Sequence, residues 1–384
     1  MQLKNFQSNA IDSLKDTFYK LWQGGNKGVP LVFKSPTGSG KTIMMAEFLH
    51  RISGEASFDA DKAFLWISKG DLANQSKQKL EQYYNDGIPW TNCLDLNNLN
   101  NGYLKKNEVF FVNWEKIVSK SKDNRKLRTE GESNTTFDKF IKNTHEKNRE
   151  LVLIIDESHL NLERDLAQEI VNIINPRIAI HVSATPRNIP NSDDELDLKA
   201  GYVRVNHADV VAEGLIKESV QIMPKEEIEA LDKNHKDLDE LLIDLALEKQ
   251  KVLKLAYEEL GLNINPLILI QLPNDEQENQ ATDGQNKLEF SKEYLINNGI
   301  HESEIAIWLS DRKENLDNIV KNSAIEKVLI FKQAAATGWD CPRAQILVSF
   351  REIRNPEFRV QVLGRILRMP EAKHYANNLL NHSY

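Results

Sequence analysis

Two features are scarce in this sequence: cysteine, and long apolar runs without charge. Among 384 residues there are two cysteines, Cys93 and Cys341, which lie far apart and lack Cys-x-x-Cys spacing. This argues against both a disulfide framework and a zinc site. No stretch approaches the roughly 18 to 20 uncharged apolar residues of a membrane span, and the N-terminus has no signal-peptide pattern. We therefore predict a cytoplasmic protein without a membrane partner.

An excess of positive charge is also missing. The chain has 49 Lys and Arg against 57 Asp and Glu, a net charge of −8. This balance does not by itself suggest nucleic acid, but net charge is a poor guide to a local groove. Basic residues gather at 116–128 and 351–368, and acidic residues gather at 226–248. A polyanion could bind one face only; for the first basic cluster, solvated surface charge explains the pattern equally well.

Short β-branched apolar runs alternate with helical patterns along the chain. This alternation predicts the α/β class, with buried strands in doubly wound parallel sheets. A chain of this length should form two domains. We expect a first lobe at 1–205, an acidic helical connector at 206–261 and a second lobe at 262–384. The strand candidates are 31–33, 64–67, 109–112, 151–155, 178–182, 267–270, 305–309, 328–331 and 346–350.

Residues 35–42, Ser-Pro-Thr-Gly-Ser-Gly-Lys-Thr, carry the most specific motif. An apolar run precedes them and a helical pattern follows, which is the order that a phosphate-binding (Walker A) loop requires. Glycines let backbone N–H groups turn toward phosphate, and the helix N-terminus favours the same charge. A chance surface turn is the alternative, and the flanking strand and helix disfavour it. The predicted nucleotide-binding residues are Thr37, Gly38, Ser39, Gly40, Lys41 and Thr42, with Lys41 on the terminal phosphates and Thr42 on Mg²⁺.

The apolar run 151–155 ends in two acids, Asp156 and Glu157. Asp156 could hold Mg²⁺, and Glu157 could orient and deprotonate the water that attacks the γ-phosphate. Acids at strand ends also serve as helix caps. We favour the catalytic interpretation because the strand lies where an ATPase needs it, after the phosphate loop.

Arg365 and Arg368 are three residues apart, so on a helix they would share a face. Two guanidinium groups aimed at a γ-phosphate would neutralise charge in the transition state. The alternative is an amphipathic helix with surface arginines, because Val360, Leu363 and Leu367 also form an apolar stripe. Both interpretations can hold on one helix.

The order of these motifs resembles that of superfamily 2 (DEAD/DEAH-like) helicases and translocases. The runs 336–345 (Ala-Thr-Gly-Trp-Asp-Cys-Pro-Arg-Ala-Gln) and 363–370 (Leu-Gly-Arg-Ile-Leu-Arg-Met-Pro) resemble the restriction (Res) subunit of Type III restriction-modification enzymes. The resemblance covers nearly the whole chain. It implies two RecA-like lobes with ATP and Mg²⁺ in a cleft between them, and a DNA-stimulated ATPase that moves on DNA in phage defence.

The resemblance also implies roles for further residues. Gln7 would read adenine, although a plain helix-surface glutamine is an equal alternative, and Gly338 and Asp340 would face the nucleotide. Four residues would couple hydrolysis to movement: His159, Ser183, Thr185 and Gln361. Two would contact the nucleic-acid backbone, although both are also ordinary structural residues: Lys69 and Asn113.

The predicted partners are DNA and a modification methyltransferase subunit that would recognise sequence. No nuclease signature is found here, so we expect a nuclease region beyond the C-terminus, and we expect the second lobe to be an incomplete fragment at that end. Two rival functions stay open: an ATP-gated clamp or switch on nucleic acid without productive hydrolysis, and an RNA-dependent helicase.

Overall fold

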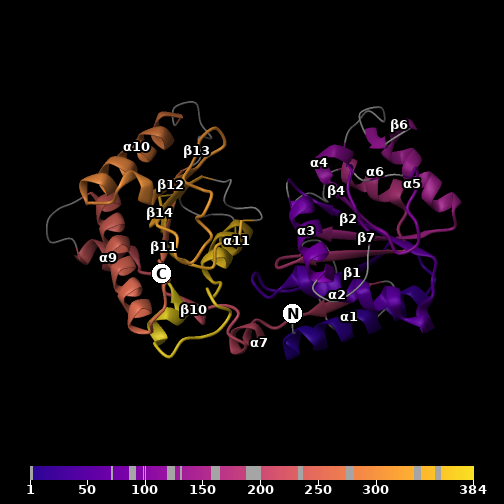
Figure 1. Cartoon of the computed structure of the whole chain (residues 1–384), viewed down its shortest axis with the longest axis horizontal. Helices are drawn as coiled ribbons and strands as arrows, with labels where there is room; N and C mark the ends of the chain where they lie inside the picture. The colour runs from indigo at the N-terminus through magenta and orange to yellow at the C-terminus, as the bar shows by residue number, and fades with distance from the viewer. Residues whose placement is uncertain are drawn as a thin grey trace. The chain divides into compact units, whose positions relative to one another are not determined.

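The structure is a computed structural model, and it shows two α/β units, Met1–Asp209 and Val210–Tyr384 (Figure 1). We describe each unit by itself. The residues that the structure describes are 3–70, 72–85, 92–97, 99, 101–118, 126–129, 132–156, 165–186, 200–231, 237–273, 281–332, 339–350 and 356–384.

The first unit is built on a seven-stranded sheet in which every pairing is parallel. The five strands predicted in this part of the chain are confirmed. Along the sheet the order is β3 (Cys93–Leu94), β4 (Val109–Asn113), β2 (Lys62–Ser68), β7 (Glu150–Asp156), β8 (Ile178–Ser183), β1 (Val29–Lys34) and β9 (Gly201–Arg204). The central strands are apolar without alternation because helices cover both faces of the sheet.

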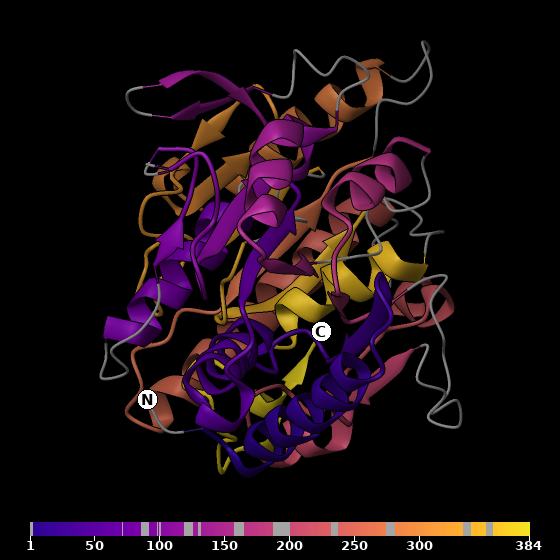
Figure 2. The same cartoon turned by 90° about the vertical axis from the view of Figure 1, so that its right-hand side faces the viewer.

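Helices flank this sheet on both sides, as Figure 1 and the turned view in Figure 2 show. One side carries α1 (Asn5–Gln23), α2 (Lys41–Gly54) and α3 (Leu72–Asn85). The other carries α4 (Trp114–Ile117), α5 (Phe137–Glu146) and α6 (Asp165–Ile174), whose apolar residues share a core with the strands. A two-stranded hairpin, β5 (Lys126–Thr129) and β6 (Glu132–Thr136), precedes α5, and α7 (His207–Ala212) follows β9.

The second unit has a five-stranded sheet of its own. Its order is β13 (Lys313–Glu314), β12 (Ile305–Trp308), β14 (Val328–Phe331), β11 (Leu267–Gln271) and β15 (Ala344–Ser349). Only β13 runs antiparallel within this sheet. The helices are α8 (Lys225–Leu231), α9 (Leu238–Glu259), α10 (Ala281–Asn297) and α11 (Pro356–Ile366), and β10 (Ser219–Val220) pairs with β16 (His382–Ser383).

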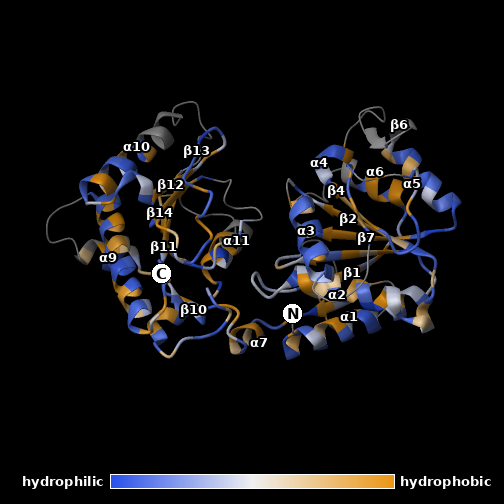
Figure 3. Ribbon diagram, viewed as in Figure 1, coloured by the Kyte–Doolittle hydropathy of each residue, from blue (hydrophilic) through white to orange (hydrophobic). Residues whose placement is uncertain are grey.

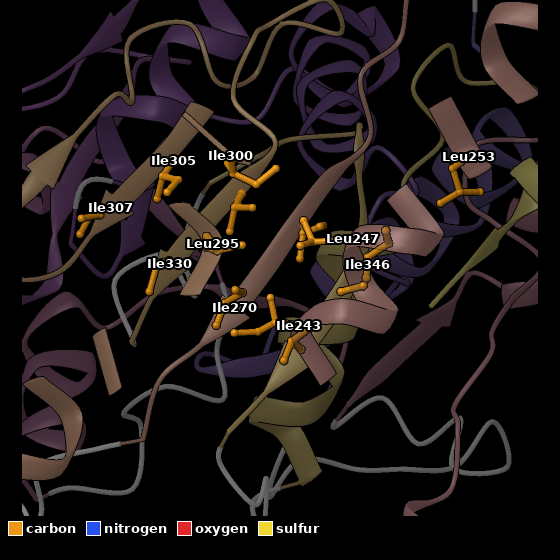
Figure 4. Close-up of a cluster of buried hydrophobic side chains, with 14 of the residues drawn as sticks. Ile243, Leu247, Leu253, Ile270, Leu295, Ile300, Ile305, Ile307, Ile330 and Ile346 are labelled. Carbon is orange, nitrogen blue, oxygen red and sulfur yellow. The ribbon is translucent and has the colours of Figure 1, made fainter. Parts of the chain in front are cut away.

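Apolar side chains from both α9 and the strands form the core of this second unit (Figure 4). Ile243 and Leu247 of α9 lie in one cluster with Ile270, Ile330 and Ile346 of the sheet. Figure 3 shows the same division by hydropathy, with apolar strands and two-sided helices. The helix that we assigned to the connector thus packs within the unit that contains the second sheet. The three-part division into lobe, connector and lobe stays a prediction.

None of the helices in the described part of the chain has the length and apolar character that a membrane crossing requires.

Candidate functional site

The parallel order of the first sheet brings the predicted phosphate loop and the predicted acids to one edge. β8 lies between β1 and β7, with Lys34 opposite Ser183 and Asp156 opposite Val182. Strands that run parallel end at the same edge, which is where ligands bind in open α/β sheets. The loop after β1, Ser183 and Asp156 therefore lie along one edge of the sheet.

The loop itself is braced by its own serines. Ser35 and Ser39 are both buried, and their hydroxyl oxygens lie 2.6 Å apart. Ser39 Oγ also donates to the carbonyl of Pro36 at 2.7 Å, so the hydroxyl of Ser35 must be the donor to Ser39. Ser35, the first residue of the motif, therefore has a structural role: its hydroxyl ties the start of the loop to Ser39.

Lys41 and the first turn of α2 provide the donors for an anion. Lys41 Nζ reaches back to the carbonyls of Ser35, at 3.2 Å, and Pro36, at 3.3 Å. Gly38 and Gly40 both have φ of 86°, the left-handed conformation in which glycine is favoured. Within the described residues, no side chain caps the N-terminus of α2 at Gly40. Uncapped N–H groups at a helix start, with a lysine beside them, fit a phosphate group.

Gln7 packs against this loop from α1. Its side-chain nitrogen donates to the carbonyl of Ser39 at 2.9 Å, and its oxygen accepts from the backbone N–H of Lys4 at 3.0 Å. Because the residue is 7% exposed, the alternative of a plain surface glutamine is wrong. Its predicted role in reading adenine stays a prediction.

Gly40 is the position at which a small change should harm the loop most. A Cβ there would come within 2.6 Å of Gln7 Nε2, and the φ of 86° disfavours any side chain. We expect Gly40→Ala to destabilise unit 1 by about 1 to 3 kcal/mol and to weaken nucleotide binding. Chemical denaturation and titration with a fluorescent ADP would measure both.

Gly54→Ala is the matched control. Gly54 ends the same helix, a Cβ added there would meet nothing within 4 Å, and its φ is not positive. Alanine there should leave nucleotide binding unchanged and, at most, raise stability by a few tenths of a kcal/mol to about 1 kcal/mol. If Gly40→Ala behaves like Gly54→Ala, the close approach of Gln7 to the loop is not a constraint.

Asp156 lies at the end of β7, half-buried, where its carboxylate accepts a hydrogen bond of 3.2 Å from the hydroxyl of Ser76 on α3. We did not single out Ser76, because a serine in a polar helix carries no signal in the sequence. Glu157 and His159 lie outside the described residues. In the part of the chain that the structure describes, no three His, Cys, Asp or Glu side chains gather to hold a metal. Mg²⁺ bound by few protein ligands together with phosphates needs no such cluster. The assignment of Thr42 and Asp156 as its ligands stays a prediction.

Ser183 links the end of β8 to the phosphate loop. Its carbonyl accepts from the backbone N–H of Ser35 at 3.1 Å, and its buried hydroxyl accepts from the N–H of Thr185 at 3.1 Å. Burial also lowers the pKa of the neighbouring His181 to about 4, so its ring is neutral at physiological pH. The hydrogen bonds of Ser183 bring the two predicted coupling residues, Ser183 and Thr185, into direct contact with each other. They also bring Ser183 into contact with the phosphate loop. Their coupling role stays a prediction.

Of the two residues predicted to contact nucleic acid, Asn113 is hydrogen-bonded within the first unit and Lys69 is exposed. Asn113 donates to the carbonyl of Gly70 at 2.7 Å and accepts from the N–H of Glu115 at 2.8 Å, so its amide ties two strand ends together. Contact with nucleic acid stays a prediction for both.

In the second unit, both predicted arginines reach one dipeptide. Arg365 donates to the carbonyl of Trp339, and Arg368 forms an ion pair with Asp340. α11 ends at Ile366, so Arg368 lies beyond it, which corrects the expectation that both arginines sit on one helix. They converge because the chain after the helix stays beside it. The side chain of Gln361 and residue Gly338 lie outside the described residues.

The apolar side of α11 also differs from the predicted stripe. Its fully buried residues are Val362 and Ile366, whereas Val360 is 42% exposed. Leu363 of the predicted stripe does pack against the cluster that contains Trp339, Cys341 and Ala344, so the stripe is wrong only at Val360. The cleft between the lobes that the resemblance implies stays a prediction.

Comparison with known proteins finds a family that resembles the first part of the chain. Residues 1–188 match the family ResIII, described as Type III restriction enzyme, res subunit. This part of the chain is similar to that family. The match supports a helicase-like, nucleotide-binding kind of protein and confirms the superfamily 2 resemblance. No curated protein matches the chain in sequence.

Solved structures show the fold of the whole chain. It is similar to "ATP-dependent Type ISP restriction-modification enzyme LlaBIII bound to DNA", with a TM-score of 0.59 and 15% identity over 98% of this chain. The chain spans 27% of that protein. A fragment assigned to the HsdR subunit of a type I restriction enzyme from Vibrio vulnificus YJ016 gives a TM-score of 0.49 at 14% identity, covering 96% of this chain and 64% of that one. A variant of S. cerevisiae Dbp5 bound to RNA and ADP BeF3 gives 0.47 at 13% identity, covering 94% and 84%.

Proposed function

We propose that this chain is the ATP-hydrolysing motor of a Type III-like restriction enzyme and that it moves on DNA. The observation that carries the proposal is the edge of the first sheet, where the loop with Lys41, the Ser183 strand end and Asp156 follow neighbouring strands. That arrangement suits a nucleoside triphosphate with Mg²⁺, and it lies in the part of the chain that matches the ResIII family.

Each residue at this edge has a distinct role in the proposal. Lys41 and the first turn of α2 bind the terminal phosphates, which are the groups that carry most charge. Thr42 and Asp156 hold Mg²⁺, whose bound form neutralises phosphate charge. Glu157, the next residue after β7, orients the attacking water and takes its proton.

Arg365 and Arg368 complete the proposed chemistry. Guanidinium groups stay charged at all relevant pH values and present several donors in a fixed plane. We assign to them the stabilisation of charge that develops on the transferred phosphoryl group. Asp340, which pairs with Arg368, would hold that side chain in place and face the nucleotide together with Gly338.

DNA binding in this proposal uses backbone contacts, so it is salt-sensitive and largely indifferent to sequence. Lys69 and Asn113 are the proposed contacts in the first unit. A modification methyltransferase subunit would supply sequence recognition, and a nuclease region would lie in the remainder of the enzyme. The likeness to a DNA-bound restriction enzyme supports this choice of polymer.

Phosphate release tests the proposal. We expect the chain to hydrolyse ATP faster with duplex or single-stranded DNA than with RNA or without polymer. Lys41→Ala should lower the rate by about 10²- to 10³-fold, since one charged donor to the transferring group is lost. Lys142→Ala is the control, because Lys142 is a lysine of the same unit that is 76% exposed and lies on α5.

Three other outcomes would point elsewhere. Stimulation by RNA alone would support an RNA-dependent helicase. DNA binding that requires ATP, without turnover, would support a clamp or switch. Equal loss of activity in Lys41→Ala and Lys142→Ala would mean that the loop after β1 is not the site of hydrolysis.

A further inference from the structure

A fully buried lysine lies at the end of the helix that carries Arg365. The side chain of Lys217 is 0% exposed, and its amino group donates to the carbonyl of Ile366 at 2.6 Å and to that of Arg368. The backbone N–H of the same residue donates to Leu367 at 2.6 Å. One residue thus binds three consecutive carbonyls at and just past the end of α11, where a helix has no partners of its own for these groups. The hydroxyl of Ser383 also donates to the carbonyl of Ile366, at 2.6 Å.

Burying a lysine at this position is energetically unfavourable unless its amino group is hydrogen-bonded. Removing an ammonium group from water is costly, and this burial lowers the pKa of Lys217 to about 7. Both protonation states keep at least two N–H donors, so both carbonyls can be bonded across neutral pH. The positive form is also favoured by the partial negative charge at a helix C-terminus.

The backbone around Lys217 is itself tightly held. Leu215 accepts from the N–H of Met369 at 3.1 Å, and the carbonyl of Ile216 lies 2.9 Å from His374 Nε2. A Cβ added to Gly214 would lie 2.8 Å from the backbone nitrogen of His374. The segment is thus held by hydrogen bonds and close contacts to the stretch 369–374, which follows α11.

The carbonyls that Lys217 binds belong to the two residues that separate the arginines, Ile366 and Leu367, and to Arg368 itself. Arg365 directly precedes Ile366, and Arg368 follows Leu367. The arginine side chains leave this backbone to contact Trp339 and Asp340. A shift of the helix end would therefore move both guanidinium groups at once.

We propose that Lys217 is the positioning residue of the arginines: by binding the three carbonyls at the end of α11, it fixes where Arg365 and Arg368 are presented. This deepens the proposed function and rests on it. Lys217 also lies in the segment that follows β9 and α7. The segment that comes after the last strand of the first sheet therefore contains the residue that binds the end of α11. A simple helix cap, which adds stability and nothing else, is the competing explanation.

Lys217→Met removes the amino group that binds Ile366 and Arg368, keeps an unbranched side chain one atom shorter, and leaves the backbone N–H bond to Leu367 in place. We expect hydrogen exchange in 363–369 to become at least tenfold faster. We expect kcat for ATP hydrolysis to fall by about 10- to 100-fold, because a displacement near 1 Å can have an effect of this size. KM and the affinity for fluorescent ADP should change by less than about threefold, because the phosphate loop is intact.

The decisive measurement is a double-variant comparison. If Lys217 acts through the arginines, adding Lys217→Met to Arg365→Ala/Arg368→Ala lowers kcat no further. A simple cap predicts instead that the two losses multiply. Tyr257→Phe is the control for stability, since it removes a buried hydrogen bond of 2.9 Å to Gln345 in the same unit, between α9 and β15.

Several results would overturn the inference: unchanged exchange in 363–369, kcat loss equal to that of Tyr257→Phe, or multiplying losses in the combined variant. If Lys217→Met does not fold, Lys217→Gln, whose shorter amide cannot span both carbonyls, is measured in its place. If the unaltered chain hydrolyses no ATP, the proposed function fails, and the exchange rates still decide whether Lys217 holds the helix end.

Discussion

Replacing Arg365 and Arg368 together by alanine should lower kcat for ATP hydrolysis by about 10³-fold or more, the range found when arginine is removed from a phosphoryl-transfer site. The arginines act on charge that appears during transfer and not on bound substrate. The affinity for ADP, set by the loop after β1, should therefore stay within about threefold of the unaltered chain. Single-turnover hydrolysis and fluorescent-ADP titration measure the two quantities separately.

Arg312→Ala is the matched control for the arginine variants. Arg312 lies in the same unit and pairs with Glu289 and Glu314 at the surface, where such ion pairs contribute little. It should leave both quantities unchanged. If the double arginine variant hydrolyses ATP as fast as Arg312→Ala, the arginines are surface residues of an amphipathic segment. The proposal that they stabilise the charge on the transferred phosphoryl group is then wrong.

Glu157→Gln should lower ATP turnover by about 10²- to 10⁴-fold, the contribution of a general base. Glutamine keeps the shape of the side chain but cannot accept the proton of water at neutral pH. Binding of ATP and of DNA does not require that proton transfer, so the variant should accumulate in an ATP-bound complex with DNA. Phosphate release and filter binding in the presence of ATP distinguish these two effects.

Glu146→Gln, an exposed change in the same unit, is the control for this prediction. It should leave turnover and binding unaltered. A chain that shows no turnover with or without Glu157→Gln, while ATP still governs DNA binding, would be a clamp. In that case hydrolysis is not what moves the protein, and Glu157 serves only as a cap after β7.

Much of the fold was predictable because buried parallel strands leave a simple pattern. The runs at 31–33, 64–67 and 151–155 are apolar without alternation, and each lies within a strand of the first sheet. β9 was not predicted: its four residues include Gly201 and Arg204, and only its pairing with β1 makes it a strand. A short edge strand depends on its neighbour more than on its own residues.

The candidate site was predictable to the extent that it is local in sequence. The phosphate loop and the Asp156 strand end are contiguous motifs, and their spacing on consecutive elements indicates their chemistry. The contact of Gln7 with Ser39 and that of Ser76 with Asp156 join different helices to the sheet edge. Neither contact follows from a motif, because each depends on how the helices pack.

The amino-acid order alone established a nucleotide-binding α/β chain with acids and arginines typical of a motor, because those features are local patterns of residue type. Tertiary structure decided which groups meet. It placed Arg368 past the end of its helix and against Asp340, and it placed Lys217 under the carbonyls of α11. These contacts join residues as many as 151 positions apart. Only the folding of the backbone brings such groups within hydrogen-bond distance, so no spacing in the chain reveals them.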